Sequence, residues 1–232
     1  MKNVQVCKNC GAENPFYVST CEKCNFILRN KIANIDLWSE IAGLLESPVN
    51  AFGRIVQSEH KNFAVSILLF AVVKFCVDST FLSMLRSKGS YADFNIFSNI
   101  IFVVAFLIAH LFAYSFIIKV ITKASGVKTR LKDNLAILTY SLIPHSLALC
   151  IIFPIEVAVF GVNIFSTNPS PFLLKPTVAY IFSGFEVLIF LWSIFLAIIG
   201  LYSQTRGKIF GIVTGIIFNF MLIGGLYLLS FI

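Results

Sequence analysis

Five long apolar stretches dominate this 232-residue chain, and each is long enough to cross the hydrocarbon core of a membrane. Spans are expected at about 63–85, at 97–120, from 134 to a little beyond 154, at 177–202 and at 209–231. Lipid offers no partners to backbone polar groups, so a single stretch of this length is expected to form a helix. The sequence therefore predicts an all-α, polytopic membrane bundle of five transmembrane helices.

The composition agrees with a membrane class. The chain is 58% hydrophobic and only 12% charged, whereas soluble domains average about 25% charged residues. Its net charge is +7, and the charged residues are concentrated before residue 62 and in the segment 119–132, a distribution typical of orientation signals and contact with anionic lipid. Aromatic residues lie inside the apolar runs and not on a basic face, so we expect no nucleic acid as a partner.

The basic residues also predict how the chain is threaded. Segments 119–133 and 203–208 hold seven Lys and Arg residues, while 86–96 and 161–176 hold three. Lys and Arg near span ends are retained in the cytoplasm. The polar stretch 1–30 lacks the apolar core of a signal peptide. We therefore expect the N-terminus in the cytoplasm and the C-terminus outside, in what we interpret as a prokaryotic cell membrane.

Four of the six cysteines lie in residues 1–30, as two C-x-x-C pairs ten residues apart: Cys7, Cys10, Cys21 and Cys24. Two such knuckles that face each other form a tetrahedral four-sulfur site for zinc. A segment this short buries too little apolar surface to fold alone, so a structural metal is expected to stabilise it. All four positions are filled by protein sulfur, which leaves none open for catalysis.

Two alternatives to zinc are disulfides and a redox pair. A cytoplasmic location argues against disulfides. A thioredoxin-like pair requires a βαβ context, which this segment lacks. We therefore predict a small zinc ribbon in residues 1–30.

Residues 31–62 are expected to form two short amphipathic helices, separated at Ser47 and Pro48. Their apolar faces can lie in the membrane interface or can pack on the protein, and the sequence does not choose between these. The predicted organisation is thus a ribbon at 1–30, interfacial helices at 31–62 and a five-span domain at 63–232.

Among the polar residues inside the predicted spans, four are candidates for a functional role: Lys74, Asp78, His110 and Glu186. Charges in hydrocarbon are costly, so each is a candidate functional residue with a partner to be found. Counted from the span ends, they lie at similar depths. We predict an intramembrane polar cluster, which serves either as a structural ion pair or as an ion relay or polar floor of a cavity.

Two further patterns concern helix shape and packing. Pro144 and Pro154 lie within the third span, which should therefore be bent or broken. Small residues recur every fourth position in spans two and five, a pattern suited to close helix contact: Ala105, Ala109 and Ala113, and Gly207, Gly211 and Gly215.

Several motifs in order resemble a known family. They are Glu46-Ser-Pro-Val-Asn-Ala-Phe52, the basic loop leading to Leu138-Thr-Tyr-Ser-Leu-Ile-Pro144, and Leu191-Trp-Ser-Ile-Phe-Leu-Ala-Ile-Ile-Gly-Leu-Tyr202. Over about residues 40–230 the chain resembles the Yip domain, a family of Rab-interacting, five-span membrane proteins. An N-terminal ribbon resembles its prokaryotic branch. The resemblance implies a non-enzymatic helper in membrane trafficking or transport, and it carries no catalytic residues.

The chain shows no H-E-x-x-H, nucleophile elbow or phosphate-binding glycine loop, so we predict that it is not an enzyme. The main hypothesis is a membrane adaptor, surrounded by lipid, whose cytoplasmic ribbon contacts another membrane protein such as an exporter. The alternative is a transporter or lipid-handling protein that uses Lys74, Asp78 and Glu186. A polar cavity that reaches Glu186 would favour the alternative, and exposed small-residue grooves would favour the adaptor.

Overall fold

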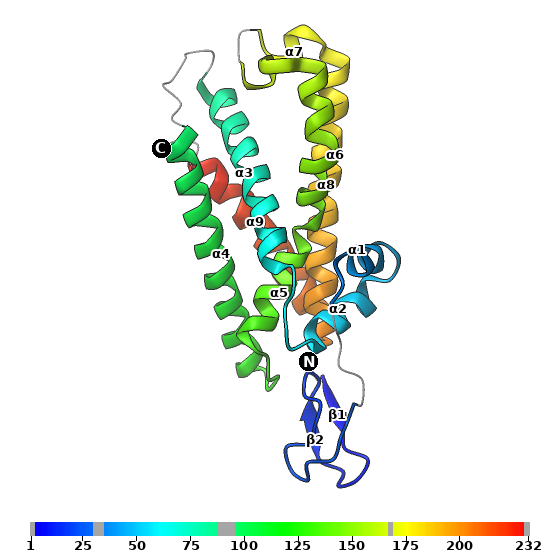
Figure 1. Cartoon of the computed structure of the whole chain (residues 1–232). Coiled ribbons are helices and arrows are strands. Elements are labelled where there is room, and N and C mark those ends of the chain that lie inside the picture. Colours follow the sequence, from blue (N-terminus) through cyan, green and yellow to red (C-terminus); the bar gives the residue numbers. More distant parts are fainter. Residues whose placement is uncertain (1–2, 30–34, 88–95, 167–168, 230–232) are drawn as a thin grey trace. The chain divides into compact units, whose positions relative to one another are not determined.

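The computed structural model describes residues 3–29, 35–87, 96–166 and 169–229 (Figure 1). Most of the predicted outer loop at 86–96 lies outside the described residues, as do 30–34 and 167–168.

A two-stranded hairpin precedes the helices. Strands β1 (Val4–Val6) and β2 (Glu13–Pro15) pair antiparallel, with Val4 opposite Pro15 and Val6 opposite Glu13. The other elements are α1 (Leu37–Glu46), α2 (Pro48–Gln57), α3 (Ala64–Ser87), α4 (Ile96–Ala124), α5 (Leu131–Ser141), α6 (Ile143–Phe160), the 3-10 helix η1 (Gly161–Phe165), α7 (Pro171–Leu174), α8 (Pro176–Thr205) and α9 (Lys208–Leu229). The predicted all-α class is confirmed.

The described residues contain five helical segments that are long and apolar enough to span a membrane. These are Ala64–Leu82, Ser98–Ala124, Leu131–Phe165, Pro176–Thr205 and Lys208–Leu229. The third comprises α5, α6 and η1, with a break at Leu142. Proline has no backbone donor, so Pro144 cannot continue the α5 hydrogen-bond ladder, and it lies in the first turn of α6 instead. The predicted interruption of span three is confirmed.

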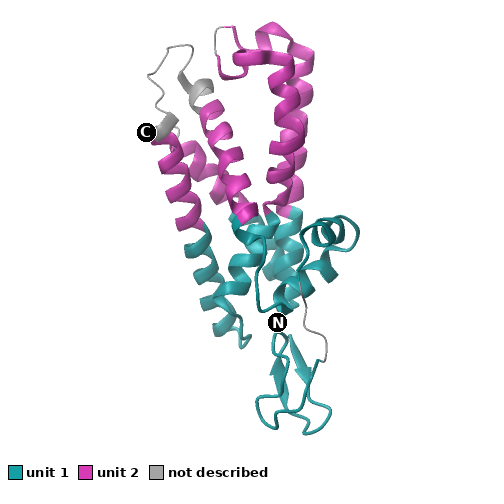
Figure 2. Cartoon of the chain, viewed as in Figure 1, with its two compact units in different colours: residues 1–65, 111–141, 195–218 teal, residues 66–110, 142–194, 219–232 magenta. Residues whose placement is uncertain are grey.

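The chain divides into two compact units (Figure 2). Unit 1 contains residues 1–65, 111–141 and 195–218, and unit 2 contains residues 66–110, 142–194 and 219–232. Helices α4, α8 and α9 each contribute residues to both units.

In unit 1, α2 is a core element. Pro48 begins the helix, as predicted, although the Ser47 side chain makes no capping hydrogen bond. The α2 side chains Phe52 and Ile55 are fully buried, and the helix contacts α5. The apolar face of α2 therefore packs on the protein.

Helix α1 differs from α2 in this respect. Asp36 caps its first turn by accepting a hydrogen bond from the Ser39 amide at 3.0 Å. Leu44 is buried, but Trp38 is 75% exposed. The apolar face of α1 is thus only partly covered.

Glycines allow the unit 1 segments of α8 and α9 to approach closely. A Cβ on Gly215 would lie 2.8 Å from the backbone nitrogen of Ile198, and one on Gly211 would lie 2.9 Å from the Ile198 carbonyl oxygen. These distances are shorter than van der Waals contact, so the glycines serve internal packing. By contrast, all three residues of the α4 stripe are exposed: Ala105, Ala109 and Ala113.

Unit 2 contains several polar contacts within apolar helices. Ser193 Oγ donates to Asn219 Oδ1 at 2.9 Å, which joins α8 to α9. His145 is buried against the Phe75 ring at a centroid distance of 4.8 Å. Neither nitrogen of His145 has a hydrogen-bond partner among the described residues.

Candidate metal centre and intramembrane charge cluster

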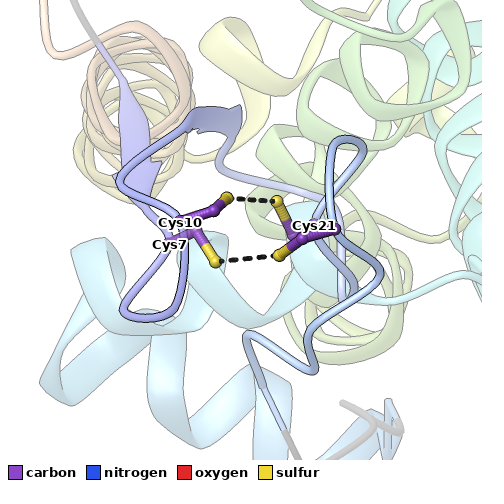
Figure 3. A group of neighbouring side chains, drawn as sticks. Cys7, Cys10 and Cys21 are labelled. Atoms are coloured by element: carbon purple, nitrogen blue, oxygen red, sulfur yellow. Dashed lines mark hydrogen bonds between the residues drawn. The ribbon is translucent and has the colours of Figure 1, made fainter.

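The four cysteines predicted from the C-x-x-C spacing come together at the hairpin. Cys7 and Cys24 place their sulfurs 3.6 Å apart, as do Cys10 and Cys21 (Figure 3). All four Sγ atoms lie within 4.8 Å of one another, and no pair forms a disulfide. A tetrahedron with metal–sulfur bonds of about 2.3 Å has sulfurs about 3.8 Å apart. The four thiols are therefore arranged to hold a metal ion.

The backbone explains how each knuckle turns. The Gly11 amide donates to Cys7 O at 2.9 Å, and the Asn25 amide donates to Cys21 O at 3.0 Å. Gly11 and Asn25 adopt φ values of 70° and 55°, in the left-handed region that glycine and asparagine tolerate best. The same turn therefore occurs twice, each time directly after the second cysteine of a pair.

Hydrogen bonds prepare the sulfurs for metal binding. Burial raises the pKa of Cys21, but backbone hydrogen bonds from Cys24 and Lys23 and the Asn14 amide outweigh it and lower this pKa to about 6. Although the Ala12 amide acts in the opposite direction, hydrogen bonding to Cys24 and burial raise the pKa of Cys10 to about 12. Metal binding to such thiols releases the protons that they still carry.

The ribbon contacts the segment between α4 and α5. The Arg130 guanidinium lies over the Tyr17 ring, 4.3 Å from its centroid. Lys128 and Glu22 form a longer ion pair at 4.0 Å, with side chains that are 73% and 57% exposed. The cation–π contact is therefore expected to contribute more than this ion pair.

A second contact reaches the end of α8. The Asn3 side chain donates to the backbone oxygens of Ser203 at 3.2 Å and Gln204 at 2.6 Å. The Gln204 side chain in turn donates to Asn134 Oδ1 at 2.9 Å, and Asn134 donates to Ser115 O at 2.9 Å. The ribbon thus contacts both of the segments in which the sequence concentrates basic residues.

Arg130 also belongs to a charge network. It donates to both carboxylate oxygens of Asp133, at 2.8 and 3.1 Å, and to Glu59 at 2.6 Å. Asp133 is fully buried and also pairs with Lys61 at 2.8 Å. Hydrogen bonds from Lys132 and Arg130 lower the pKa of Glu59 to about 2. Asp133 and Glu59 were not among the residues predicted from the sequence.

Three of the four predicted intramembrane residues lie together in unit 2. Lys74 Nζ is 2.5 Å from Asp78 Oδ1, one helical turn along α3, and 2.9 Å from Glu186 Oε1 on α8. The Lys74 side chain is 3% exposed. His110 lies on α4, stacked on the Phe106 ring at a centroid distance of 5.6 Å. The ion pairs within the described part of the chain therefore join three of the four predicted residues.

The cluster lines a pocket, which matches the cavity considered as one alternative from the sequence. Lys74, Asp78 and Glu186 share this pocket with Glu156 of α6, which the sequence analysis had given no special role. Its aromatic wall comes from α3, α6, η1, α7 and α8: Phe81, Phe160, Phe165, Phe172 and Phe182. The signal that could have identified Glu156 is its position within an apolar run, where charged residues are rare.

Five span-length apolar helices define the class: the molecule is an integral membrane protein with a helical bundle. The chain belongs to the Yip1 domain family, whose family model matches residues 42–232. The predicted family resemblance is thereby confirmed. No curated protein and no solved structure matches the chain. The family match begins within α1, so the four-cysteine ribbon precedes the matched region.

Proposed function

We propose that this protein is a non-enzymatic adaptor or accessory protein of a membrane transport or trafficking assembly. Membership of the Yip1 domain family supports a trafficking-related role. The proposed partner is another membrane protein, such as an exporter, in a prokaryotic cell membrane. The ribbon makes the contact, and zinc, held by Cys7, Cys10, Cys21 and Cys24, keeps the ribbon folded.

The proposed orientation places the ribbon in the cytoplasm and the C-terminus outside. The ribbon contacts Arg130 and Gln204, which belong to the two basic segments. Lys and Arg near span ends favour the cytoplasmic side. The reducing cytoplasm also keeps four adjacent thiols available for a metal.

The observation that carries the proposal is a set of apolar side chains on the ribbon surface. Val6 is 59% exposed and Ile27 is 57% exposed, and both line a pocket together with Phe26. Exposed apolar groups gathered at one place are typical of protein–protein contacts.

The experiment is a mild-detergent pull-down after cross-linking in cells, with mass spectrometry of the captured proteins. The variant Val6→Asp/Ile27→Asp adds charge to the apolar surface without touching a metal ligand. Lys23→Asp is the matched control, because it introduces the same carboxylate at an exposed polar position of the ribbon. We expect the control to retain its membrane-protein partner and the double variant to lose it.

Zinc content and melting temperature are measured on both variants to establish that the ribbon remains folded. Retention of the same partner by a zinc-loaded Val6→Asp/Ile27→Asp protein would contradict the proposal. The exposed alanine stripe of α4 is suited to close contact with a helix of another membrane protein, which also supports an adaptor.

One observation favours a second candidate function, that of a transporter or lipid-handling protein. The pocket in unit 2 reaches Glu186 and includes the whole Lys74, Asp78 and Glu186 cluster. The test is the double variant Lys74→Met/Glu186→Gln. A normally folded protein that loses function in cells supports a working cluster, and one that keeps function contradicts it.

A further inference from the structure

The pocket in unit 2 has an excess of acidic groups. Three carboxylates line it, Asp78, Glu156 and Glu186, together with one ammonium group, Lys74. Lys74 is already bound to Asp78 and Glu186, and its side chain is 97% enclosed, since only 3% is exposed. Glu156 makes no hydrogen bond or ion pair within the described part of the chain. The pocket therefore has more acidic than basic groups, and a further cation would balance them.

The two carboxylates that bind Lys74 can also accept further hydrogen bonds. Each binds Lys74 through one oxygen atom, Oδ1 of Asp78 and Oε1 of Glu186. The second oxygen of each carboxylate accepts no hydrogen bond from the described residues. Their side chains are 25% and 33% exposed, so both can accept from a group that enters the pocket.

Aromatic rings form much of the rest of the wall. Phe160 and Phe182 contact each other edge to face, with centroids 6.0 Å apart, and Phe172 contacts Tyr180 in the same way at 5.4 Å. These pairs fix the ring positions, so the wall is preformed. Aromatic rings attract ammonium ions and pack against hydrocarbon. Carboxylates next to such rings are a combination suited to an organic cation.

A bare metal ion fits this pocket poorly. Among the described residues, only the four cysteines form a group of three or more ligand atoms close enough to hold a metal ion. The three carboxylates are therefore too widely spaced to share a metal ion. Calcium and magnesium prefer six or more converging oxygen ligands, which a phenylalanine wall does not supply.

We propose that this pocket binds an organic ammonium ion that carries an apolar chain. The ammonium group donates a hydrogen bond to Glu156 and is attracted by the negative charges of Asp78 and Glu186, and the apolar part lies against Phe160, Phe172 and Phe182. This proposal concerns binding alone, so it does not depend on the ribbon contact or on transport.

The same chemistry has two possible sources: a free amphiphilic amine, or the amino headgroup of a membrane phospholipid. The pocket includes Phe165 of η1 and Phe172 of α7, from the segment that connects α6 and α8. Connecting segments lie near the ends of spans, where lipid headgroups are found. Both sources are therefore tested.

The full-length protein, purified in one neutral detergent, is titrated with n-decylamine and with n-decanol, and binding is followed by the shift in melting temperature. The alcohol has the same chain length but no positive charge. In a second arm, native mass spectrometry measures how strongly phosphatidylethanolamine and phosphatidylcholine are retained. The variants are Glu156→Gln and Phe182→Leu, with Glu46→Gln as control, because Glu46 is an exposed acid on α1 outside the pocket.

Loss of a charged hydrogen-bond acceptor is expected to weaken decylamine binding about tenfold in Glu156→Gln. Phe182→Leu is expected to weaken it severalfold, while Glu46→Gln matches the wild type. Binding of n-decanol is expected to be the same for the wild type and Glu156→Gln.

Glu156-dependent retention of phosphatidylethanolamine supports the proposal with a lipid source, and Glu156-dependent binding of decylamine alone supports it with a free amine. Equal binding of amine and alcohol, or equal amine binding by wild type and Glu156→Gln, overturns it. Glu156 has no partner to lose within the described residues, so this variant is expected to fold normally, which its melting temperature without ligand checks.

Discussion

The guanidinium of Arg130 lies 4.3 Å from the centre of the Tyr17 ring, and it also holds buried Asp133 through two hydrogen bonds. One side chain thus contacts both the metal-binding ribbon and the start of the third span. In unit 1, the position of the ribbon therefore depends on the same residue that neutralises a buried carboxylate.

The first prediction compares two of the ribbon contacts, the Tyr17–Arg130 contact and the Glu22–Lys128 ion pair. Tyr17→Leu is expected to weaken attachment of the ribbon by about 1 kcal/mol, because it removes a cation–π contact next to a partly enclosed arginine. Glu22→Gln is expected to change attachment by less than about 0.5 kcal/mol, since its ion pair with Lys128 is long and exposed. Hydrogen exchange of ribbon amides in the intact protein measures both. Equal effects of the two variants would contradict the ranking.

Removal of the metal is the second test. We expect one zinc ion per chain by elemental analysis and none in Cys10→Ser/Cys21→Ser. Structural zinc supplies about 10 kcal/mol of apparent folding free energy to a small ribbon, so the metal-free ribbon should unfold. Limited proteolysis should then cut within residues 1–30 while the apolar spans remain intact. A metal-free ribbon that resists protease would show that the metal is dispensable for folding.

The intramembrane ion pair predicts a strong asymmetry between variants. Lys74→Met leaves Asp78 and Glu186 without their cation and is expected to destabilise the bundle by about 3 kcal/mol. The triple variant Lys74→Met/Asp78→Asn/Glu186→Gln removes the charges together and should recover most of this loss. Melting temperatures in one detergent give the comparison. If the triple variant is no more stable than Lys74→Met, the unpaired carboxylates are not the cause of the destabilisation in Lys74→Met.

A pH series tests the network around Glu59. Hydrogen bonds from Lys132 and Arg130 lower its folded-state pKa to about 2, below its ordinary value of about 4.3. The stabilisation is therefore present above about pH 5 and is lost as the pH falls towards 2. Because the side chain is 57% exposed, solvent screening limits the effect to about 1 kcal/mol. The difference in melting temperature between wild type and Glu59→Gln should shrink over this range and at high salt.

Two glycines of α9 form a matched pair for packing. Gly215→Ala is expected to destabilise the protein by about 1 to 3 kcal/mol, because the new Cβ would lie 2.8 Å from the backbone of Ile198. Gly224→Ala adds its Cβ where no atom lies within 4 Å, so it should be neutral or slightly stabilising. Thermal unfolding of both proteins in the same detergent measures the difference. Equal melting temperatures would mean that α8 and α9 are less closely packed than the structure indicates.

The sequence alone was sufficient for features that depend on neighbouring residues. Five apolar runs predict five spans because a single helix must satisfy its own backbone in lipid. Pro144 predicts a break in the third span because proline lacks a donor. Two C-x-x-C pairs predict a compact four-sulfur site because each knuckle is a local turn. The order of the motifs was enough to indicate the family.

Only the tertiary structure determined which faces meet. Periodicity predicts that a helix has an apolar or small-residue face, but it does not predict which element packs against that face. The glycines of α9 pack against Ile198, whereas the alanines of α4 are exposed, although both stripes have the same spacing. Depth along a span gives only one coordinate of a side chain, whereas the rotation of each helix decides which neighbours that side chain contacts. Glu156 joins the charged pocket for the same reason: helices α3, α6 and α8 come together there, across more than a hundred residues of sequence.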